Sequence, residues 1–268
     1  MKILALQNPF GAPVYHEETV SSTFDAARLL ASQNEAHGTV ITADFQEKGR
    51  GRQGRPWAAE NGKSLLFTIL LRYADFSSVP GLLTLKTGLA VSLATEDLFP
   101  SLTGLVKIKW PNDIMIGACE AQDSYKKAAG ILTEADGSNV YIGVGFNVAQ
   151  EEFPEEYRAR ALSLIQVTPG LHENARFILL EKILSRLYDE IEKKTDASLS
   201  QDNGPWREAL LKRLYKKGET VVFAEGAADS EHLIEGTFSG IGPGGELLIF
   251  PKNEKEERAF VTGELRVY

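Results

Sequence analysis

The stretch Gly49-Arg50-Gly51-Arg52-Gln53-Gly54-Arg55 is the most informative part of this chain. It lies within seventeen residues that show no periodic pattern, between two segments, 39–46 and 64–72, that are typical of strands. Glycine lets backbone N–H groups approach a ligand closely, and arginine presents a fixed fork of donors to carboxylate or phosphate oxygens. A loop this long inside a compact domain is usually functional or disordered. We therefore predict an anion-binding loop, with a flexible, solvated segment as the alternative.

The composition of the whole chain limits the kind of anion. The 268 residues carry a net charge of −8 at pH 7, which favours one small anionic ligand over a nucleic acid that needs a broad basic face. Cys119 is the only cysteine, which excludes an intramolecular disulfide and a cysteine-based metal site. No apolar run is long enough for a membrane span or a signal peptide, so we expect a cytoplasmic protein without a membrane contact.

The periodicity of the chain changes near residue 215. Before that point, the pattern alternates between helices and strands, and Ser22 with Asp25 predicts a capping box for the first helix. The predicted helices are 22–33, 80–98, 173–194 and 206–214, and the further predicted strands are 106–110, 114–116, 129–135 and 140–148. After Gly218, only short strands remain at 220–223, 233–239, 246–250, 259–261 and 265–267, a spacing typical of a small β-barrel. We expect a first domain over 1–214 and a second over 215–268.

Residues 140–148 form a predicted strand whose two faces differ sharply. One face is apolar throughout, whereas the other carries Tyr141, Gly143, Gly145 and Asn147. Glycine weakens a strand unless something must approach its backbone closely. A ligand on that face would explain both glycines, and so would the close packing of a helix.

Two further segments combine charged and polar residues near strand ends. Lys109-Trp110-Pro111-Asn112-Asp113 interrupts a strand that alternates apolar residues with Lys107 and Lys109, so we expect those lysines on its solvent face. The short polar side chains at the break either serve a site or only form a turn. Lys126-Lys127 precedes an apolar strand and by itself indicates no more than exposed edge charges.

Together these segments resemble biotin–protein ligases. The arginine and glycine loop of that family, followed by tryptophan, is matched by 49–55 with Trp57, and its Lys-Trp-Pro-Asn-Asp segment by 109–113. A downstream lysine before Gly-Ile-Leu is matched by Lys127, and a Gly-x-Gly-x-Asn strand by 143–147. The chain departs from the family at Phe24, where Ser-Thr-Asn is common, and in a longer polar excursion over 117–126.

The resemblance implies an α+β fold with a central mixed β-sheet and helices, similar to class II aminoacyl-tRNA synthetases, followed by an SH3-like barrel. It implies that biotin and ATP form biotinyl-5′-AMP, with Mg²⁺ screening the triphosphate, before a lysine of a biotin carboxyl carrier domain takes the biotin. Only about fourteen residues precede the first predicted strand, so we expect neither an N-terminal DNA-binding domain nor DNA binding. The oligomeric state stays open, with a homodimer as one alternative.

The resemblance also assigns residues. Lys127 and Arg52 would stabilise charge on the α-phosphate, and Asp113 would join them as a catalytic residue. The residues expected to hold biotin are Ser22, Thr23, Gln46, Gly49, Arg50, Gly51, Arg52, Lys127, Gly143 and Gly145. Those expected to hold ATP are Arg52, Arg55, Trp57, Lys109, Asn112, Asp113 and Asn147. No Mg²⁺ ligand is assigned. A lipoate or octanoyl ligase or transferase of the same fold, and a non-catalytic protein that binds biotin or RNA, are the alternative functions.

Overall fold

The computed structural model describes residues 1–75, 77, 79, 82–118, 124–193, 204–226 and 231–266. Parts of several predicted features lie outside these ranges, namely Pro80 and Gly81 of the helix predicted over 80–98, residues 119–123 of the polar excursion including Cys119, Lys194 and Val267. The helices are α1 (Thr23–Ser32), α2 (Leu83–Leu98), α3 (Glu155–Arg158), α4 (Ala175–Ile191) and α5 (Pro205–Arg213). The strands of the first 147 residues are β1 (Lys2–Ile3), β2 (Val14–Val20), β3 (Thr39–Gln46), β4 (Ser64–Arg72), β5 (Val106–Lys109), β6 (Asp113–Gly117), β7 (Tyr125–Asp136) and β8 (Asn139–Asn147).

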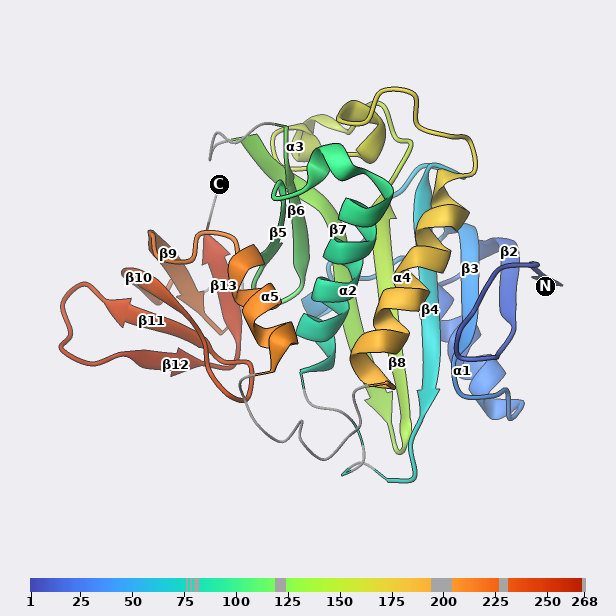
Figure 1. Cartoon of the computed structure of the whole chain (residues 1–268), viewed down its shortest axis with the longest axis horizontal. Coiled ribbons are helices and arrows are strands. Elements are labelled where there is room, and N and C mark those ends of the chain that lie inside the picture. Colours follow the sequence, from blue (N-terminus) through green and yellow to red (C-terminus); the bar gives the residue numbers. More distant parts are fainter. Residues whose placement is uncertain are drawn as a thin grey trace.

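These eight strands form one mixed sheet in the order β1-β2-β3-β4-β8-β7-β6-β5. Strands β2 and β3 are parallel, and the other neighbours are antiparallel. Helices α2 and α4 cover one face of the sheet, as Figure 1 shows, while α1 lies on the opposite face. Strand β8 is central, and its residues Val140, Ile142, Val144 and Phe146, with Val148 directly after it, belong to the large core beneath α2 and α4. The predicted apolar face of this strand is therefore confirmed.

A second, smaller core lies under α1. It contains Phe24, Ala27, Leu30, Ile41 and Tyr141. The first half of the other face of β8, which carries Tyr141, is therefore also covered. Helix α1 begins at the predicted N-cap, since the Ser22 hydroxyl accepts a hydrogen bond from the Phe24 N–H at 3.3 Å. The capping-box prediction for Asp25 is wrong, because its carboxylate pairs with Arg50 instead.

Strand β5 shows another correction. Lys109 was expected on a solvent face, but only 2% of its surface is exposed, and its Nζ lies 3.6 Å from Glu264 Oε1 of the C-terminal segment. Strand β7 also begins earlier than predicted, at Tyr125, so that Lys126 and Lys127 lie within it.

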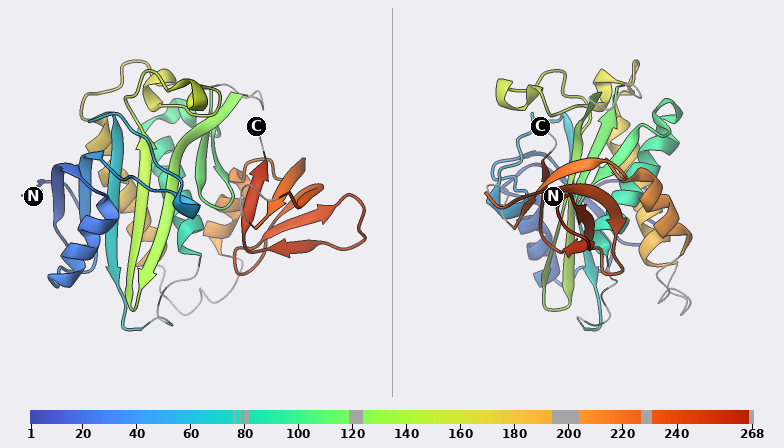
Figure 2. Two further views of the ribbon diagram at one scale, coloured as in Figure 1. Left: turned by 180° about the vertical axis from the view of Figure 1, so that it is seen from behind. Right: turned by 90° about the vertical axis from the view of Figure 1, so that its left-hand side faces the viewer.

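The last strands, β9 (Thr220–Glu225), β10 (Leu233–Ile241), β11 (Leu247–Pro251), β12 (Arg258–Phe260) and β13 (Gly263–Arg266), form a five-stranded antiparallel sheet in the order β12-β11-β10-β9-β13. Figure 2 shows this unit beside the β5 edge of the large sheet. The predicted fold class, a mixed sheet with helices followed by a small β-domain, is confirmed. The division at residue 214 stays a prediction.

Trp110 joins the two sheets. Its indole Nε1 donates to the Gly245 carbonyl at 2.9 Å, and its ring lies 6.1 Å from the ring of Phe223 in β9. The side chain is 2% exposed. This contact fixes the small sheet against the turn between β5 and β6.

Replacing Trp110 by Phe should therefore lower the free energy of unfolding by about 1–2 kcal/mol, because the half-buried Gly245 carbonyl loses its donor. Denaturant unfolding measures this change. Trp206→Phe is the matched control, since the buried Trp206 ring forms no hydrogen bond to a described residue and should lose less. Equal losses in both variants would contradict the proposed contribution of the hydrogen bond.

Candidate active site

A cavity of about 340 Å³ lies over the glycine face of β8. Fourteen of the sixteen sequence-predicted site residues line it, namely Thr23, Gln46, Arg50, Gly51, Arg52, Arg55, Trp57, Lys109, Asn112, Asp113, Lys127, Gly143, Gly145 and Asn147. The two that do not line it are Ser22, which caps α1, and Gly49. Gly49 packs against the Trp57 backbone, since a Cβ there would lie 2.7 Å from the Trp57 carbonyl oxygen. Segments far apart in the sequence thus meet at one cavity, while the roles of their residues stay predictions.

The arginine loop is a small hairpin. Gly51 N–H donates to the Arg55 carbonyl at 2.7 Å, and Trp57 N–H donates to the Gly49 carbonyl at 2.9 Å. The turn needs positive φ at Gln53 and Gly54, where φ is 56° and 72°. The hairpin therefore presents Arg52 at its tip and Trp57 at its base.

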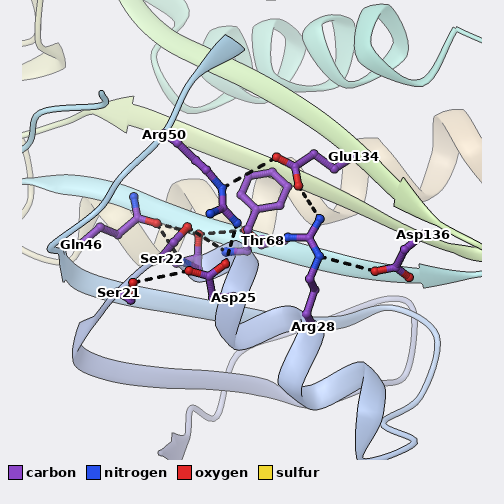
Figure 3. A network of polar contacts seen from close by, with 11 residues as sticks. Ser21, Ser22, Asp25, Arg28, Gln46, Arg50, Thr68, Glu134 and Asp136 are labelled. Atoms are coloured by element: carbon purple, nitrogen blue, oxygen red, sulfur yellow. Dashed lines mark hydrogen bonds and ion pairs between the residues drawn. The ribbon is translucent and has the colours of Figure 1, made fainter. Parts of the chain in front are cut away.

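The three loop arginines have different surroundings. Arg50 pairs with Asp25 of α1 at 2.6 Å and with Glu134 of β7 at 3.8 Å, as Figure 3 shows. Arg55 pairs with Glu264 of β13 at 3.1 Å. Arg52 forms no ion pair with a carboxylate of the described residues, and its Nη1 only reaches Asn112 Oδ1 at 3.4 Å. Burial lowers the pKa of Arg52, so its charge would gain from an incoming anion.

Lys127 and Lys126 point to different places. Lys127 Nζ lies 2.7 Å from Asp113 Oδ1 and 5.4 Å from the centre of the Trp57 ring, inside the cavity. Lys126 Nζ instead donates to the Arg158 carbonyl at 3.0 Å. The choice of Lys127 over its neighbour therefore agrees with the geometry.

The glycines of β8 lie beneath two aromatic rings. A Cβ on Gly143 would come within 2.2 Å of the Phe24 ring, and one on Gly145 within 2.5 Å of the Trp57 ring. Trp57 also covers Gly130 of β7, where a Cβ would lie 2.9 Å from the ring. The sequence left two explanations for these glycines, a bound ligand and the close packing of a helix. Close packing is present, but the partners are single side chains, one from α1 and one from the arginine loop.

The cavity has two chemically different ends. Arg52, Lys109 and Lys127 bring positive charge to one end, with Asp113 beside them. At the other end, Gln46 Oε1 accepts from the backbone N–H and the hydroxyl of Thr23 at 2.8 and 2.9 Å. These two bonds hold the Gln46 amide with its NH₂ group available to a ligand. A molecule with an anionic end and a neutral polar end would match this arrangement.

The sequence did not indicate several residues at this site, among them Gln150, Tyr157 and Arg160, which line the cavity. Thr68 of β4 donates its hydroxyl proton to Thr23 Oγ1 at 2.9 Å and so orients the polar end, and a single threonine in an apolar run carries no pattern that indicates this contact. Glu264 reaches the cavity from β13, with Oε1 3.6 Å from Lys109 Nζ. Burial lowers the pKa of Lys109, while Asp113 and Glu264 oppose this shift. No sequence signal linked Glu264 to the site.

Within the described ranges, no cluster of three or more histidine, cysteine or acidic side chains could hold a metal ion. Among the helices of the same ranges, none has the length and apolar character to cross a membrane.

Comparisons with known proteins bear on the same residues. A model of the biotin/lipoate A/B protein ligase family matches residues 17–147. The chain is 37% identical over 160 residues to the bifunctional ligase/repressor BirA of Bacillus subtilis, a match that covers 57% of this chain and 46% of that protein. It is 36% identical over 182 residues to the biotin–[acetyl-CoA-carboxylase] ligase of Mycobacterium tuberculosis, covering 65% of this chain and 60% of that protein. The chain thus spans about half the length of these curated relatives.

Among solved structures, the biotin protein ligase from Aquifex aeolicus in complex with biotin and ATP superposes with a TM-score of 0.74 at 29% identity. The match covers 94% of this chain and 97% of that one, so it includes both sheets.

Glu264→Gln should lower the free energy of unfolding by about 2–3 kcal/mol, because it removes the carboxylate next to the buried Lys109 charge and also leaves Arg55 unpaired. Glu235→Gln is the matched control on the same small sheet. Its partner Lys252 and Glu235 itself are 66% and 51% exposed, so the loss should stay below about 1 kcal/mol. Similar losses in the two variants would mean that Glu264 does not support the buried lysine.

Proposed function

We propose that the chain is a member of the biotin/lipoate A/B protein ligase family, whose model matches residues 17–147, and that it is an ATP-dependent biotin–protein ligase. The observation that carries this proposal is the two-ended cavity over β8, with Arg52 and Lys127 at one end and Gln46 with Thr23 at the other. Biotin has a carboxylate and a neutral ureido ring, so it matches both ends of the cavity. The relatives named above support the same reading.

The proposed reaction has two steps. The carboxylate of biotin attacks the α-phosphate of ATP and expels pyrophosphate, which gives biotinyl-5′-AMP. A lysine amine of a carrier domain then attacks the acyl carbon and expels AMP. In the first step two anions approach each other, so preorganised cations that stabilise the developing charge lower the barrier.

We assign that role to Lys127 and Arg52. Lys127 is held by Asp113, and Arg52 is the loop arginine without a carboxylate partner among the described residues. Arg55, Trp57, Lys109, Asn112 and Asn147 would surround the nucleotide, since they line the same cavity. Gly51 and the backbone of Arg50 would approach the biotin carboxylate.

Mg²⁺ stays a prediction. Asp113 and Glu264 are carboxylates that line the cavity, but each is paired with a lysine or arginine. Mg²⁺ commonly binds through substrate phosphates with one or two carboxylates, so an ion carried by the triphosphate would suit these residues better than a separate protein site.

The proposed partner is the biotin carboxyl carrier domain of a carboxylase, and the proposed location is the cytoplasm, where ATP is available. The net charge of −8 argues against DNA as a partner. A homodimer stays a prediction.

The experiment that separates this proposal from the lipoate alternative is ATP–pyrophosphate exchange with biotin or with lipoate as the acid. We expect exchange with biotin and little with lipoate, because a linear acyl chain leaves the polar groups of Thr23 and Gln46 without partners. Exchange with lipoate alone would overturn the assignment of the substrate. Binding of biotin without exchange would indicate a non-catalytic binder.

Lys127→Ala should slow biotin-dependent exchange by about 100–1000-fold, as expected for the loss of one charge-stabilising donor. Lys126→Ala is a matched control on the adjacent residue, whose amine faces the Arg158 carbonyl, and it should retain near-normal exchange. The opposite pattern would show that the catalytic lysine has been assigned wrongly.

A further inference from the structure

Phe24 occupies the neutral end of the cavity. It belongs to α1, directly after Thr23, and its side chain is 4% exposed. The ring lines the cavity together with Gln46 and Gly143. An apolar ring therefore stands beside the two polar side chains that would meet a ligand head group.

The Phe24 ring is held from two sides. Below it, Gly143 leaves space for the ring, because a Cβ there would lie 2.2 Å from the ring. On another side, the Arg50 guanidinium lies 5.6 Å from the ring centre and is itself held by Asp25 and Glu134. Arg28 pairs with Glu134 and Asp136 at 2.5 and 3.5 Å and extends this network, drawn in Figure 3. The ring is thus fixed in position.

A fixed ring at this place limits the ligand by shape. Successive residues on one face of a strand lie roughly 7 Å apart. The Phe24 ring over Gly143 and the Trp57 ring over Gly145 therefore lie side by side, with Lys127 next to Trp57. A ligand whose carboxylate meets Lys127 directs its other end towards Phe24.

We propose that Phe24 determines substrate specificity, as an apolar wall that rejects head groups larger than an unsubstituted cyclic urea. The inference rests on the proposed function, since it takes biotin as the ligand. A hydrogen-bonding residue at this position would recognise the head group by polar contact, whereas Phe24 recognises it by excluding volume. Polar recognition is left to Gln46 and Thr23.

The test measures dissociation constants by calorimetry, without ATP, for biotin and for the two biotin derivatives that carry one methyl group on a ureido nitrogen. The wild-type chain should bind biotin, and it should bind at least one derivative roughly tenfold or more weakly. Phe24→Ala should reduce that ratio severalfold. Leu30→Ala is the matched control, because Leu30 packs in the same α1 core but does not line the cavity. It should leave the ratio unchanged.

A second pair of variants covers the case in which Phe24→Ala does not fold. Phe24→Leu keeps most of the packing and should also reduce the ratio of the two dissociation constants, that of the methylated derivative over that of biotin. Circular dichroism verifies that the variant is folded. Gly143→Ala should push the ring into the cavity and weaken the binding of biotin itself, and Phe24→Leu should partly restore it. The inference is overturned if the ratio stays the same in both Phe24 variants, or if Leu30→Ala changes it equally. Absence of biotin binding by the wild-type chain would instead overturn the proposed function, and the inference with it.

Discussion

The site depends on one steric constraint, the lack of side chains at Gly143 and Gly145 of β8. These gaps receive the rings of Phe24 and Trp57, which a Cβ at either glycine would displace. Phe24 places the start of α1, with Thr23 beside it, and Trp57 places the base of the arginine hairpin. Two elements that are distant in the sequence are therefore positioned against the same strand. Because the opposite face of β8 is packed under α2 and α4, the strand cannot shift to relieve a clash.

Charge in the cavity is nearly balanced within the protein. Arg50, Arg55, Lys109 and Lys127 each have a carboxylate partner, whereas Arg52 and Arg160, which also line the cavity, form no ion pair with a described residue. This arrangement explains how an acidic chain can keep several cations close together. It also means that an anionic ligand competes with Asp113 and Glu264 for most of these cations. Arg52 has no such competing ion pair among the described residues, and burial has already removed part of its hydration.

The sequence predicted local features better than those that depend on tertiary packing. Strand β8 and the N-cap at Ser22 followed from periodicity and local motifs, and the grouping of Lys127 with the loop followed from the resemblance to biotin–protein ligases. The exposure of Lys109 was predicted wrongly, because alternation along β5 contains no information about its contact with Glu264 of β13. Asp25 was misjudged for the same reason, since its partner Arg50 lies twenty-five residues away. Thr68 and Glu264 had no local pattern that could indicate them.

The ion pair between Arg55 and Glu264 connects the small sheet to the hairpin that would enclose a ligand. An anion that draws Arg55 away from Glu264 weakens the contact between β13 and the loop. Because such coupling is reciprocal, a change that strengthens the contact between β13 and the loop must lower the affinity for the anion by the same factor. The C-terminal sheet therefore takes part in the thermodynamics of the site without a motif of its own.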